Sequence, residues 1–206
     1  MKQPLGVILA GGLARRMGGG DKGMLSLGGQ PILKHVVDRL EPQVEALALN
    51  ANGDPARFAS FGLPVLADSI DGFVGPLAGV LAGLDWAAEQ GADTIVTAAA
   101  DTPFFPCDLV PRLVMAADSM TNPLVLAATS DPKRRRVRHP TFGLWPVSLR
   151  DDLRAALIGG LRKVVVWTEQ HNGREALFES DRIDPFFNVN TPEDLIAAQS
   201  ALEAVS

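Results

Sequence analysis

Near its amino terminus the chain reads Val7-Ile8-Leu9-Ala10-Gly11-Gly12-Leu13-Ala14-Arg15-Arg16-Met17-Gly18-Gly19-Gly20-Asp21-Lys22, an apolar segment that runs straight into a glycine-rich, basic loop. Glycines have no Cβ, so their backbone N–H groups can come close to an anion. Arg15, Arg16 and Lys22 add positive charge within a few residues of one another. The stretch predicts a buried strand followed by a loop that binds the phosphates of a nucleoside triphosphate. The alternative is a glycine loop whose charges are incidental.

Two well-known phosphate motifs are absent from this loop. A P-loop requires a lysine between glycine and Ser or Thr, but Lys22 follows Asp21 and precedes Gly23. The dinucleotide fingerprint G-x-G-x-x-G is missing too, because Gly11-Gly12 is followed by Leu13, Ala14 and Arg15. The loop is therefore neither of these two sites.

The composition fits one domain that spans residues 1–206, with 47% hydrophobic and 21% charged residues. The net charge of −5 argues against a nucleic-acid-binding protein. The single cysteine, Cys107, excludes an intrachain disulfide and a multi-cysteine zinc site. We find neither a signal-peptide pattern nor an apolar run of the ~18 residues that a membrane helix needs, so we expect a cytoplasmic protein without membrane contacts.

Apolar strand patterns alternate with helical patterns along the chain, which predicts right-handed βαβ units and an α/β fold. We expect a mostly parallel sheet with helices on both faces. The predicted strands cover residues 5–10, 44–49, 65–67, 94–100, 124–128 and 141–145, with an extended segment at 186–189. The predicted helices cover residues 31–40, 55–61, 76–89, 106–117 and 149–157, and a last helix begins at Thr191-Pro192. Residues 163–169 suit either a strand or a helix.

Polar residues follow several of these strands at their carboxyl ends, where α/β sheets bind ligands. Asn50 and Asn52 follow the second strand, Asp68 follows the third, and Asp101 follows the apolar run 95–100. A carboxylate there can hold Mg²⁺ against phosphate oxygens, and amides can read a base or ribose. We predict Asp101 as the metal ligand, although Asp-Thr-Pro also suits a turn or helix cap. Near the carboxyl terminus the same edge receives Asn188 and Asn190.

Taken in order, these blocks resemble the signature of the molybdenum cofactor guanylyltransferases. The matching blocks are Leu9-Ala10-Gly11-Gly12 with Arg16-Met17-Gly18, Asp21-Lys22, Asn50-Ala51-Asn52, Asp68-Ser69, Gly75-Pro76-Leu77-Ala78-Gly79, Asp101-Thr102-Pro103-Phe104, His139-Pro140-Thr141, and 188–195. The first block alone indicates only the wider nucleotidyltransferase superfamily, whereas the whole set is specific. Leu13-Ala14-Arg15 departs from the Ser that many relatives carry before the second arginine position.

The resemblance implies a Rossmann-like, three-layer nucleotidyltransferase fold and the transfer of GMP from GTP to the terminal phosphate of molybdopterin, with release of pyrophosphate. It places a nucleotide site at Leu9, Ala10, Gly11, Gly12, Lys22, Asn50, Asp68 and Asp101, with Mg²⁺ on Asp101. Arg16, Lys22 and Asp101 would be catalytic. Asn188 and Asn190 match a segment near the pterin, and His139 is a further candidate on the acceptor side. The implied partners are GTP, molybdopterin and proteins that deliver or receive the cofactor.

Elementary electrostatics supports this chemistry without the resemblance. A phosphate monoester and a triphosphate are both anions, so the site must neutralise their repulsion, which Mg²⁺ on Asp101 together with Lys22 and Arg16 would do. The attacking phosphate oxygen is already ionised at neutral pH, so no strong general base is needed.

The run Lys133-Arg134-Arg135-Arg136-Val137-Arg138 holds five of the nineteen Lys and Arg residues. It suits a solvated surface loop. Our hypothesis is that this loop helps to capture the anionic pterin or a protein that delivers it.

Three other functions stay open at this point. A cytidylyltransferase for the same pterin and a sugar-1-phosphate nucleotidyltransferase would bind the same triphosphate, although the blocks at Gly11-Gly12 and residues 75–79 look like the guanine-specific branch. A non-catalytic nucleotide sensor is the third, and it would have less need of both Asp101 and Lys22.

Overall fold

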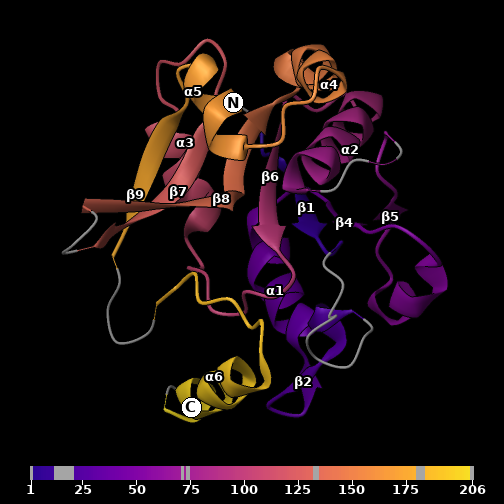
Figure 1. The fold of residues 1–206 in the computed structure, drawn as a ribbon, viewed down its shortest axis with the longest axis vertical. Coiled ribbons are helices and arrows are strands. Elements are labelled where there is room, and N and C mark those ends of the chain that lie inside the picture. Colours follow the sequence, from indigo (N-terminus) through magenta and orange to yellow (C-terminus); the bar gives the residue numbers. More distant parts are fainter. Residues whose placement is uncertain are drawn as a thin grey trace.

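A computed structural model describes residues 2–11, 21–70, 72, 75–131, 135–179 and 184–204. Within this part of the chain, a seven-stranded sheet forms the centre of the molecule, with the strand order β5-β4-β1-β6-β8-β7-β9 (Figure 1). The strands are β1 (Leu5–Leu9), β4 (Leu47–Asn50), β5 (Val65–Leu66), β6 (Thr94–Ala99), β7 (Val125–Asp131), β8 (Arg135–Pro146) and β9 (Arg174–Phe178).

The sheet is mostly parallel, as the sequence predicts. Strand β1 lies parallel to β4 on one side and to β6 on the other, and β7 lies parallel to β9. Strand β8 runs in the opposite direction and pairs with both β6 and β7. The strands β4, β1 and β6 therefore end at the same edge of the sheet, which is where the predicted site residues follow them.

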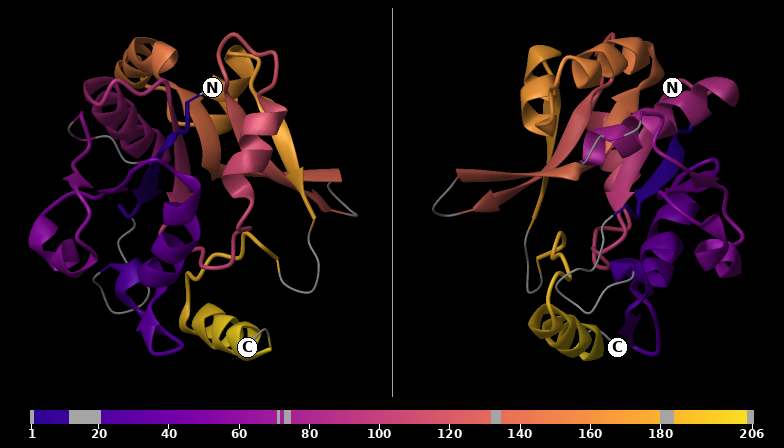
Figure 2. Two further views of the ribbon diagram at one scale, coloured as in Figure 1. Left: turned by 180° about the vertical axis from the view of Figure 1, so that it is seen from behind. Right: turned by 45° about the vertical axis from the view of Figure 1, so that its right-hand side comes forward.

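Helices cover both faces of the sheet because neighbouring strand residues point to opposite sides. Ile8 packs in a core with α1 (Ile32–Leu40) and α3 (Leu109–Ala116). Val7 packs in the other core with α2 (Pro76–Glu89), α4 (Arg150–Ile158) and α5 (Val164–Gln170). Figure 2 shows the resulting three layers from two further sides.

Two glycines let helix α2 lie very close to the sheet. A Cβ on Gly79 would be 2.2 Å from Asn50 Oδ1 and 2.8 Å from Leu9 Cδ2. A Cβ on Gly83 would be 2.8 Å from both Val7 Cγ2 and Ile95 Cδ1. This close packing brings the first turn of α2 to the edge where β1 and β4 end.

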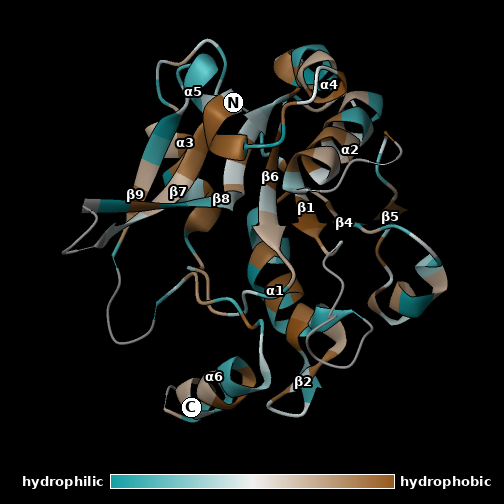
Figure 3. Cartoon of the chain, in the orientation of Figure 1, coloured by the Kyte–Doolittle hydropathy of each residue, from teal (hydrophilic) through white to brown (hydrophobic). Residues whose placement is uncertain are grey.

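The last helix, α6 (Pro192–Glu203), begins at the predicted N-cap Thr191 and forms a capping box with Asp194. It packs on a small hairpin of β2 (Ser26–Leu27) and β3 (Gln30–Pro31), in a cluster that includes Ala198 and Leu202. Figure 3 shows that α6 carries hydrophobic and hydrophilic residues, in contrast to the hydrophobic strand β1.

Several predicted elements differ from the structure. Residues 55–61 form a 3₁₀ helix, η4 (Pro55–Phe61), and the ambiguous segment is the helix α5, in which Val164 and Trp167 are buried three residues apart. Residues 186–189 are not a strand, and the sequence patterns missed β9, β2 and β3. The remaining 3₁₀ turns are η2 (Lys22–Met24), η3 (Glu41–Gln43) and η5 (Val147–Leu149).

None of the helices in the described residues combines the length and apolarity needed to span a bilayer.

Candidate functional site

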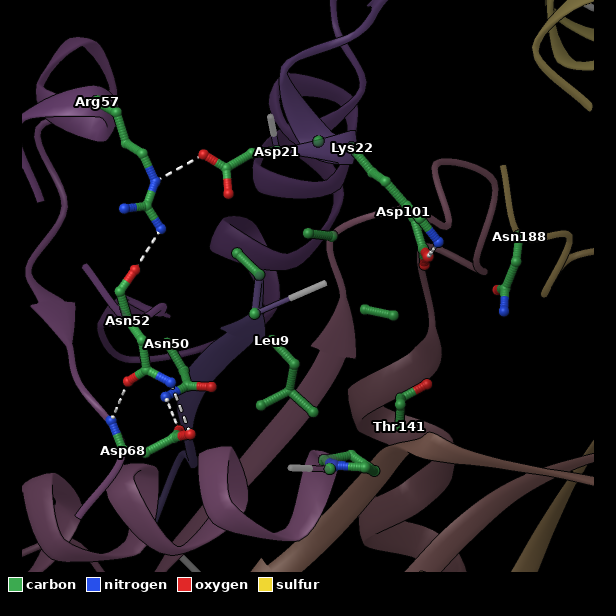
Figure 4. Close-up of a pocket in the computed structure, with 17 residues that line it drawn as sticks. Leu9, Asp21, Lys22, Asn50, Asn52, Arg57, Asp68, Asp101, Thr141 and Asn188 are labelled. Carbon is green, nitrogen blue, oxygen red and sulfur yellow. Dashed lines mark hydrogen bonds and ion pairs between the residues drawn. The ribbon is translucent and has the colours of Figure 1, made fainter. Parts of the chain in front are cut away.

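A pocket of about 690 Å³ opens at the carboxyl ends of β1, β4 and β6. Its described lining comes from segments far apart in the chain, as the sequence analysis predicts (Figure 4). The lining residues are Leu9, Ala10, Gly11, Asp21, Lys22, Gly23, Asn50, Asn52, Arg57, Asp68, Gly75, Pro76, Ala99, Ala100, Asp101, Thr141 and Asn188.

Lys22 and Asp101 lie together in this pocket. The distance from Lys22 Nζ to Asp101 Oδ2 is 3.8 Å, and their side chains are only 20% and 22% exposed. Burial raises the pKa of the Asp101 carboxyl, and the charge of Lys22 opposes this rise without cancelling it. Lys22 Nζ also donates a hydrogen bond of 2.5 Å to Asn190 Oδ1. The Asp101 carboxylate is thus largely removed from water, and the positive charge of Lys22 offsets only part of the cost of that burial.

Such a carboxylate is chemically suited to hold a divalent metal ion. Mg²⁺ prefers oxygen ligands and is commonly held by one or two carboxylates together with substrate phosphates and water. The described residues contain no cluster of three or more His, Cys, Asp or Glu side chains that would hold a metal by itself.

A hydrogen-bonded amide and carboxylate cluster forms the opposite side of the pocket. Asp68 Oδ1 accepts a hydrogen bond of 3.0 Å from Asn50 Nδ2, and Asp68 Oδ2 accepts one of 2.8 Å from Asn52 Nδ2. The Asp68 backbone N–H donates to Asn52 Oδ1 at 2.9 Å. These bonds fix the three side chains before a ligand arrives, and the carboxylate oxygens retain capacity to accept further donors.

The sequence did not predict a role for Arg57, which lines the pocket, or for Thr102, whose hydroxyl contacts the lining residue Asn188. Arg57 comes from η4, and its Nε lies 2.6 Å from Asp21 Oδ2, while its Nη2 donates to the backbone oxygen of Asn52 at 2.6 Å. Thr102 is fully buried, and its Oγ1 donates to Asn188 Oδ1 at 2.5 Å. Asp21 stands next to the predicted site residue Lys22, so a role for Asp21 in the pocket could have been predicted. No local sequence feature indicates that Arg57 of η4 reaches the pocket.

His139, predicted on the acceptor side, lies outside the described lining of the pocket. Its ring stacks on Phe186 with centroids 4.1 Å apart, and its Nε2 lies 2.9 Å from Thr129 Oγ1. Burial lowers the pKa of this imidazole. Thr141 of the same strand lines the pocket instead (Figure 4).

The structure thus gathers most predicted site residues into one pocket: Leu9, Ala10, Gly11, Lys22, Asn50, Asp68, Asp101 and Asn188. Asn190 joins them through its hydrogen bond to Lys22. Gly12, Arg15 and Arg16 lie outside the described residues.

The second half of the basic run 133–138 forms a strand and not a loop. Residues 135–138 belong to strand β8, whereas Lys133 and Arg134 lie outside the described residues. Arg136 pairs with Glu175 at 3.0 Å, and Arg138 pairs with Glu175 at 2.5 Å and with Glu169 at 2.6 Å. The prediction of a solvated loop is wrong for these two arginines because acidic side chains of β9 and α5 fix them.

Comparisons with known proteins identify the family of the chain. The family model of the MobA-like NTP transferase domain matches residues 6–173. The molybdenum cofactor guanylyltransferase of Mesorhizobium japonicum is 50% identical over 98% of this chain and 97% of its own length. That of Bradyrhizobium sp. (strain ORS 278) is 51% identical over 94% of this chain and 91% of its own length.

Solved structures share the fold. The crystal structure of molybdopterin-guanine dinucleotide biosynthesis protein A from Archaeoglobus fulgidus has a TM-score of 0.72 and 22% identity, and the match covers 97% of this chain and 99% of that one. A nucleotidyl transferase from Methanothermobacter thermautotroptrophicus has a TM-score of 0.74 and 19% identity, with 100% of both chains covered. The chain therefore belongs to the MobA-like NTP transferases and, within them, to the molybdenum cofactor guanylyltransferase family.

Proposed function

We propose that this protein transfers GMP from GTP to the terminal phosphate of molybdopterin and forms the guanine dinucleotide cofactor and pyrophosphate. Relatives that are about half identical to the chain over nearly its whole length are molybdenum cofactor guanylyltransferases. The observation that carries the proposal is the pairing of Lys22 and Asp101 at one side of a pocket with the Asn50, Asn52 and Asp68 cluster at the other.

The Asn50, Asn52 and Asp68 cluster suits the nucleoside end of GTP. Carboxylate and amide oxygens accept hydrogen bonds from ribose hydroxyls and from the N–H groups of a base. Both carboxylate oxygens of Asp68 are already oriented by amides, so binding requires little rearrangement of the side chain. We assign the nucleoside to this side of the pocket.

Lys22 and the backbone of residues 9–11 suit the triphosphate end. A Cβ on Gly11 would meet no atom of the described protein within 4 Å, so a phosphate can approach this backbone closely. Lys22 would neutralise charge on the departing pyrophosphate, and Asp101 would hold Mg²⁺. When bound, the metal supplies positive charge to the phosphate oxygens. The predicted contribution of Gly12 and Arg16 belongs to the same end.

The acceptor would enter beside Asn188 and Thr141. Both residues line the pocket near Asp101, and Asn188 is held by the Thr102 hydroxyl. The incoming phosphate oxygen is already ionised at neutral pH, so these residues need only orient it. We propose a cytoplasmic reaction in which other proteins deliver molybdopterin and receive the product.

A nucleotide panel tests the proposal directly. We expect Mg²⁺-dependent pyrophosphate release with GTP and molybdopterin, little release with CTP, and little release when either the pterin or the metal is withheld. Asp101→Ala should lower turnover by at least about 100-fold, whereas Asp118→Ala, which changes an exposed carboxylate beyond α3, should leave it unchanged. Equal turnover with CTP, or full activity of Asp101→Ala, would contradict the proposal.

A further inference from the structure

Three consecutive residues before α6 make contacts at the end of strand β6. Asn188 Oδ1 accepts from Thr102 Oγ1 at 2.5 Å, and the Val189 backbone N–H donates to the Asp101 backbone oxygen at 2.9 Å. Asn190 Oδ1 accepts from Lys22 Nζ at 2.5 Å. The segment therefore ties the carboxyl-terminal part of the chain to both Asp101 and Lys22.

The carboxylate that fixes this segment is Asp194. Its Oδ2 accepts hydrogen bonds of 2.9 Å from the backbone N–H groups of both Asn190 and Thr191. The bond from Asn190 is the largest of the influences that lower the pKa of Asp194, and the charge of Lys22 adds a smaller one. A capping box needs only the bond to Thr191, so the second bond to Asn190 exceeds what helix capping requires.

The helix that carries Asp194 is itself anchored on the body of the protein. Gln199 Oε1 accepts a hydrogen bond of 2.8 Å from the Gly28 backbone N–H, and Ala198 and Leu202 pack in the cluster with Leu27 and Ile32. The strands β2 and β3 of this cluster follow directly after η2, which contains Lys22. Asp194 therefore has a fixed position, and its hydrogen bond fixes the backbone of Asn190 relative to the body of the protein.

We propose that Asp194 is a positioning residue for Lys22: its carboxylate fixes the backbone of Asn190, whose side-chain amide holds the Lys22 ammonium group beside Asp101. The inference rests on the proposed function, because that function gives Lys22 its role in the reaction. Asp194, which caps helix α6, would act on the reaction by fixing where Lys22 lies. A lysine has four side-chain torsions and finds many positions unless something fixes its ammonium group. The Asn190 oxygen fixes it at a position 3.8 Å from the Asp101 carboxylate.

The test compares Asp194→Ala with two matched controls on the same helix end. Thr191→Ala removes the other half of the capping box, and Glu193→Ala removes an exposed charge one residue away. Asp194→Asn keeps an oxygen that can accept both backbone N–H groups, so we expect its kcat to stay close to the parent value. We expect kcat for guanylyl transfer to fall about 10-fold in Asp194→Ala and to stay near the parent value in both controls, although Thr191→Ala also lowers the melting temperature.

A second readout needs no substrate. Acylation of Lys22 by an amine-reactive ester is followed by mass spectrometry, with Lys34 as the internal reference. We expect Lys22 to react several-fold faster in Asp194→Ala and Asn190→Ala than in the parent, Thr191→Ala or Glu193→Ala proteins, because its ammonium group has lost its acceptor.

A double variant separates positioning from a general loss of stability. If Asp194 acts through Asn190, the Asn190→Ala/Asp194→Ala protein should turn over no more slowly than Asn190→Ala alone. Additive losses, or equal Lys22 reactivity in Asp194→Ala and Thr191→Ala, would overturn the inference. Full activity of Lys22→Ala would instead refute the role of Lys22 in the proposed function, and the acylation result would still decide the positioning contact.

Discussion

Asp101 is a charged side chain that the fold buries and only partly compensates. Lys22 lies 3.8 Å away, beyond ideal hydrogen-bond distance, and burial still raises the pKa of the carboxyl above its ordinary value. Residues that serve a reaction commonly reduce the stability of the protein that carries them. Asp101 has this character, because the substrate-free protein keeps a carboxylate that a bound metal would compensate.

We expect Asp101→Asn to unfold at a higher temperature than the parent at pH 7, by the equivalent of about 0.5–2 kcal/mol. Because the folded-state pKa is raised, the contribution of Asp101 to stability is fully present below the unfolded-state value of 3.8 and is lost as the pH rises through the folded-state value. The advantage of Asn should therefore shrink toward pH 3.8. Melting temperatures without nucleotide or metal check this, and a variant that is less stable throughout would contradict it.

His139 gives a second pH dependence of opposite sign. Burial lowers its pKa below 6.5, so its contribution to stability is full above pH 6.5 and is lost as the pH falls through the folded-state pKa. We expect His139→Gln to lose less melting temperature than the parent between pH 8 and pH 5, with a difference of at most about 1.4 kcal/mol per pH unit. Parallel curves would show that the pKa of the imidazole is the same in the folded and the unfolded protein, and would contradict this expectation. The KM for molybdopterin in the same variant tests the acceptor role predicted for this residue.

Residue patterns predicted much of the pocket because several of the predicted residues lie at or just beyond the end of a strand. The common location of Asn50, Asp68 and Asp101 could be predicted from the rule that parallel strands end at one edge of the sheet. Arg57 and Thr102 could not be predicted in this way. Arg57 reaches the pocket through a 3₁₀ helix whose packing depends on the whole fold, and the role of Thr102 depends on a segment 86 residues later.

At the scale of elements, the position of helix α2 is controlled by its small residues. Gly79 and Gly83 face β4, β1 and β6, and each leaves no room for a methyl group. Their sequence spacing of four places them on one side of the helix. Gly79 packs tightly against β1 and β4, and Gly75 and Pro76 at the start of the same helix line the pocket.

Gly79→Ala should impair the site although alanine favours helices by about 1 kcal/mol over glycine. The new methyl group would displace Asn50 Oδ1, from which it would lie 2.2 Å away, and break the bond from Asn50 to Asp68. We expect the KM for GTP to rise about 10-fold, because a lost buried hydrogen bond costs ~1–3 kcal/mol. Steady-state kinetics with varied GTP measures this effect.

Gly83→Ala is the matched control. Its methyl group would meet Val7 and Ile95, which are core residues away from the pocket lining. We expect a loss of about 1–3 kcal/mol of stability from overpacking and an unchanged KM for GTP. A rise in KM for both variants would mean that the whole helix shifts and that Asn50 is not the specific target.

Periodicity predicted the long elements and missed the short ones. The strands β2 and β3 have two residues each, which is too few for an alternating pattern. Val164, Val165 and Val166 favour a strand by propensity, but the burial of Val164 and Trp167 on one side of α5 overrides that preference. The direction of β8 is a tertiary property that no local pattern encodes.

At the scale of the whole molecule, three ion pairs connect the long hairpin of β7 and β8 to its neighbours. Arg136 and Arg138 of β8 pair with Glu175 of β9, and Arg138 also reaches Glu169 of α5. Figure 2 shows that this hairpin extends beyond the helical layers. The network therefore holds a projecting part of the sheet against its last strand.

We expect the double variant Arg136→Ala/Arg138→Ala to lose about 1 kcal/mol of stability, with a smaller loss at high salt. Urea denaturation at two salt concentrations measures this loss, and a salt-independent loss would point to packing instead of charge. The KM for molybdopterin at low salt tests the capture hypothesis in the same protein. An unchanged KM would leave these two arginines with a structural role alone.

The reversed direction of β8 has a consequence for engineering the acceptor site. β8 is antiparallel to β6, so Thr141 lies just beyond the paired residues Thr97 and Gly143, at the pocket edge. At Thr141 the pocket is bordered by a part of β8 in which the pairing with β7 changes register, between the pairs Leu126–Gly143 and Ala127–His139. A designer who wishes to change the acceptor should therefore vary the side chain at position 141 and keep the strand length, since bulges of this kind re-aim the side chains beside a site and an altered length would change where Thr141 points.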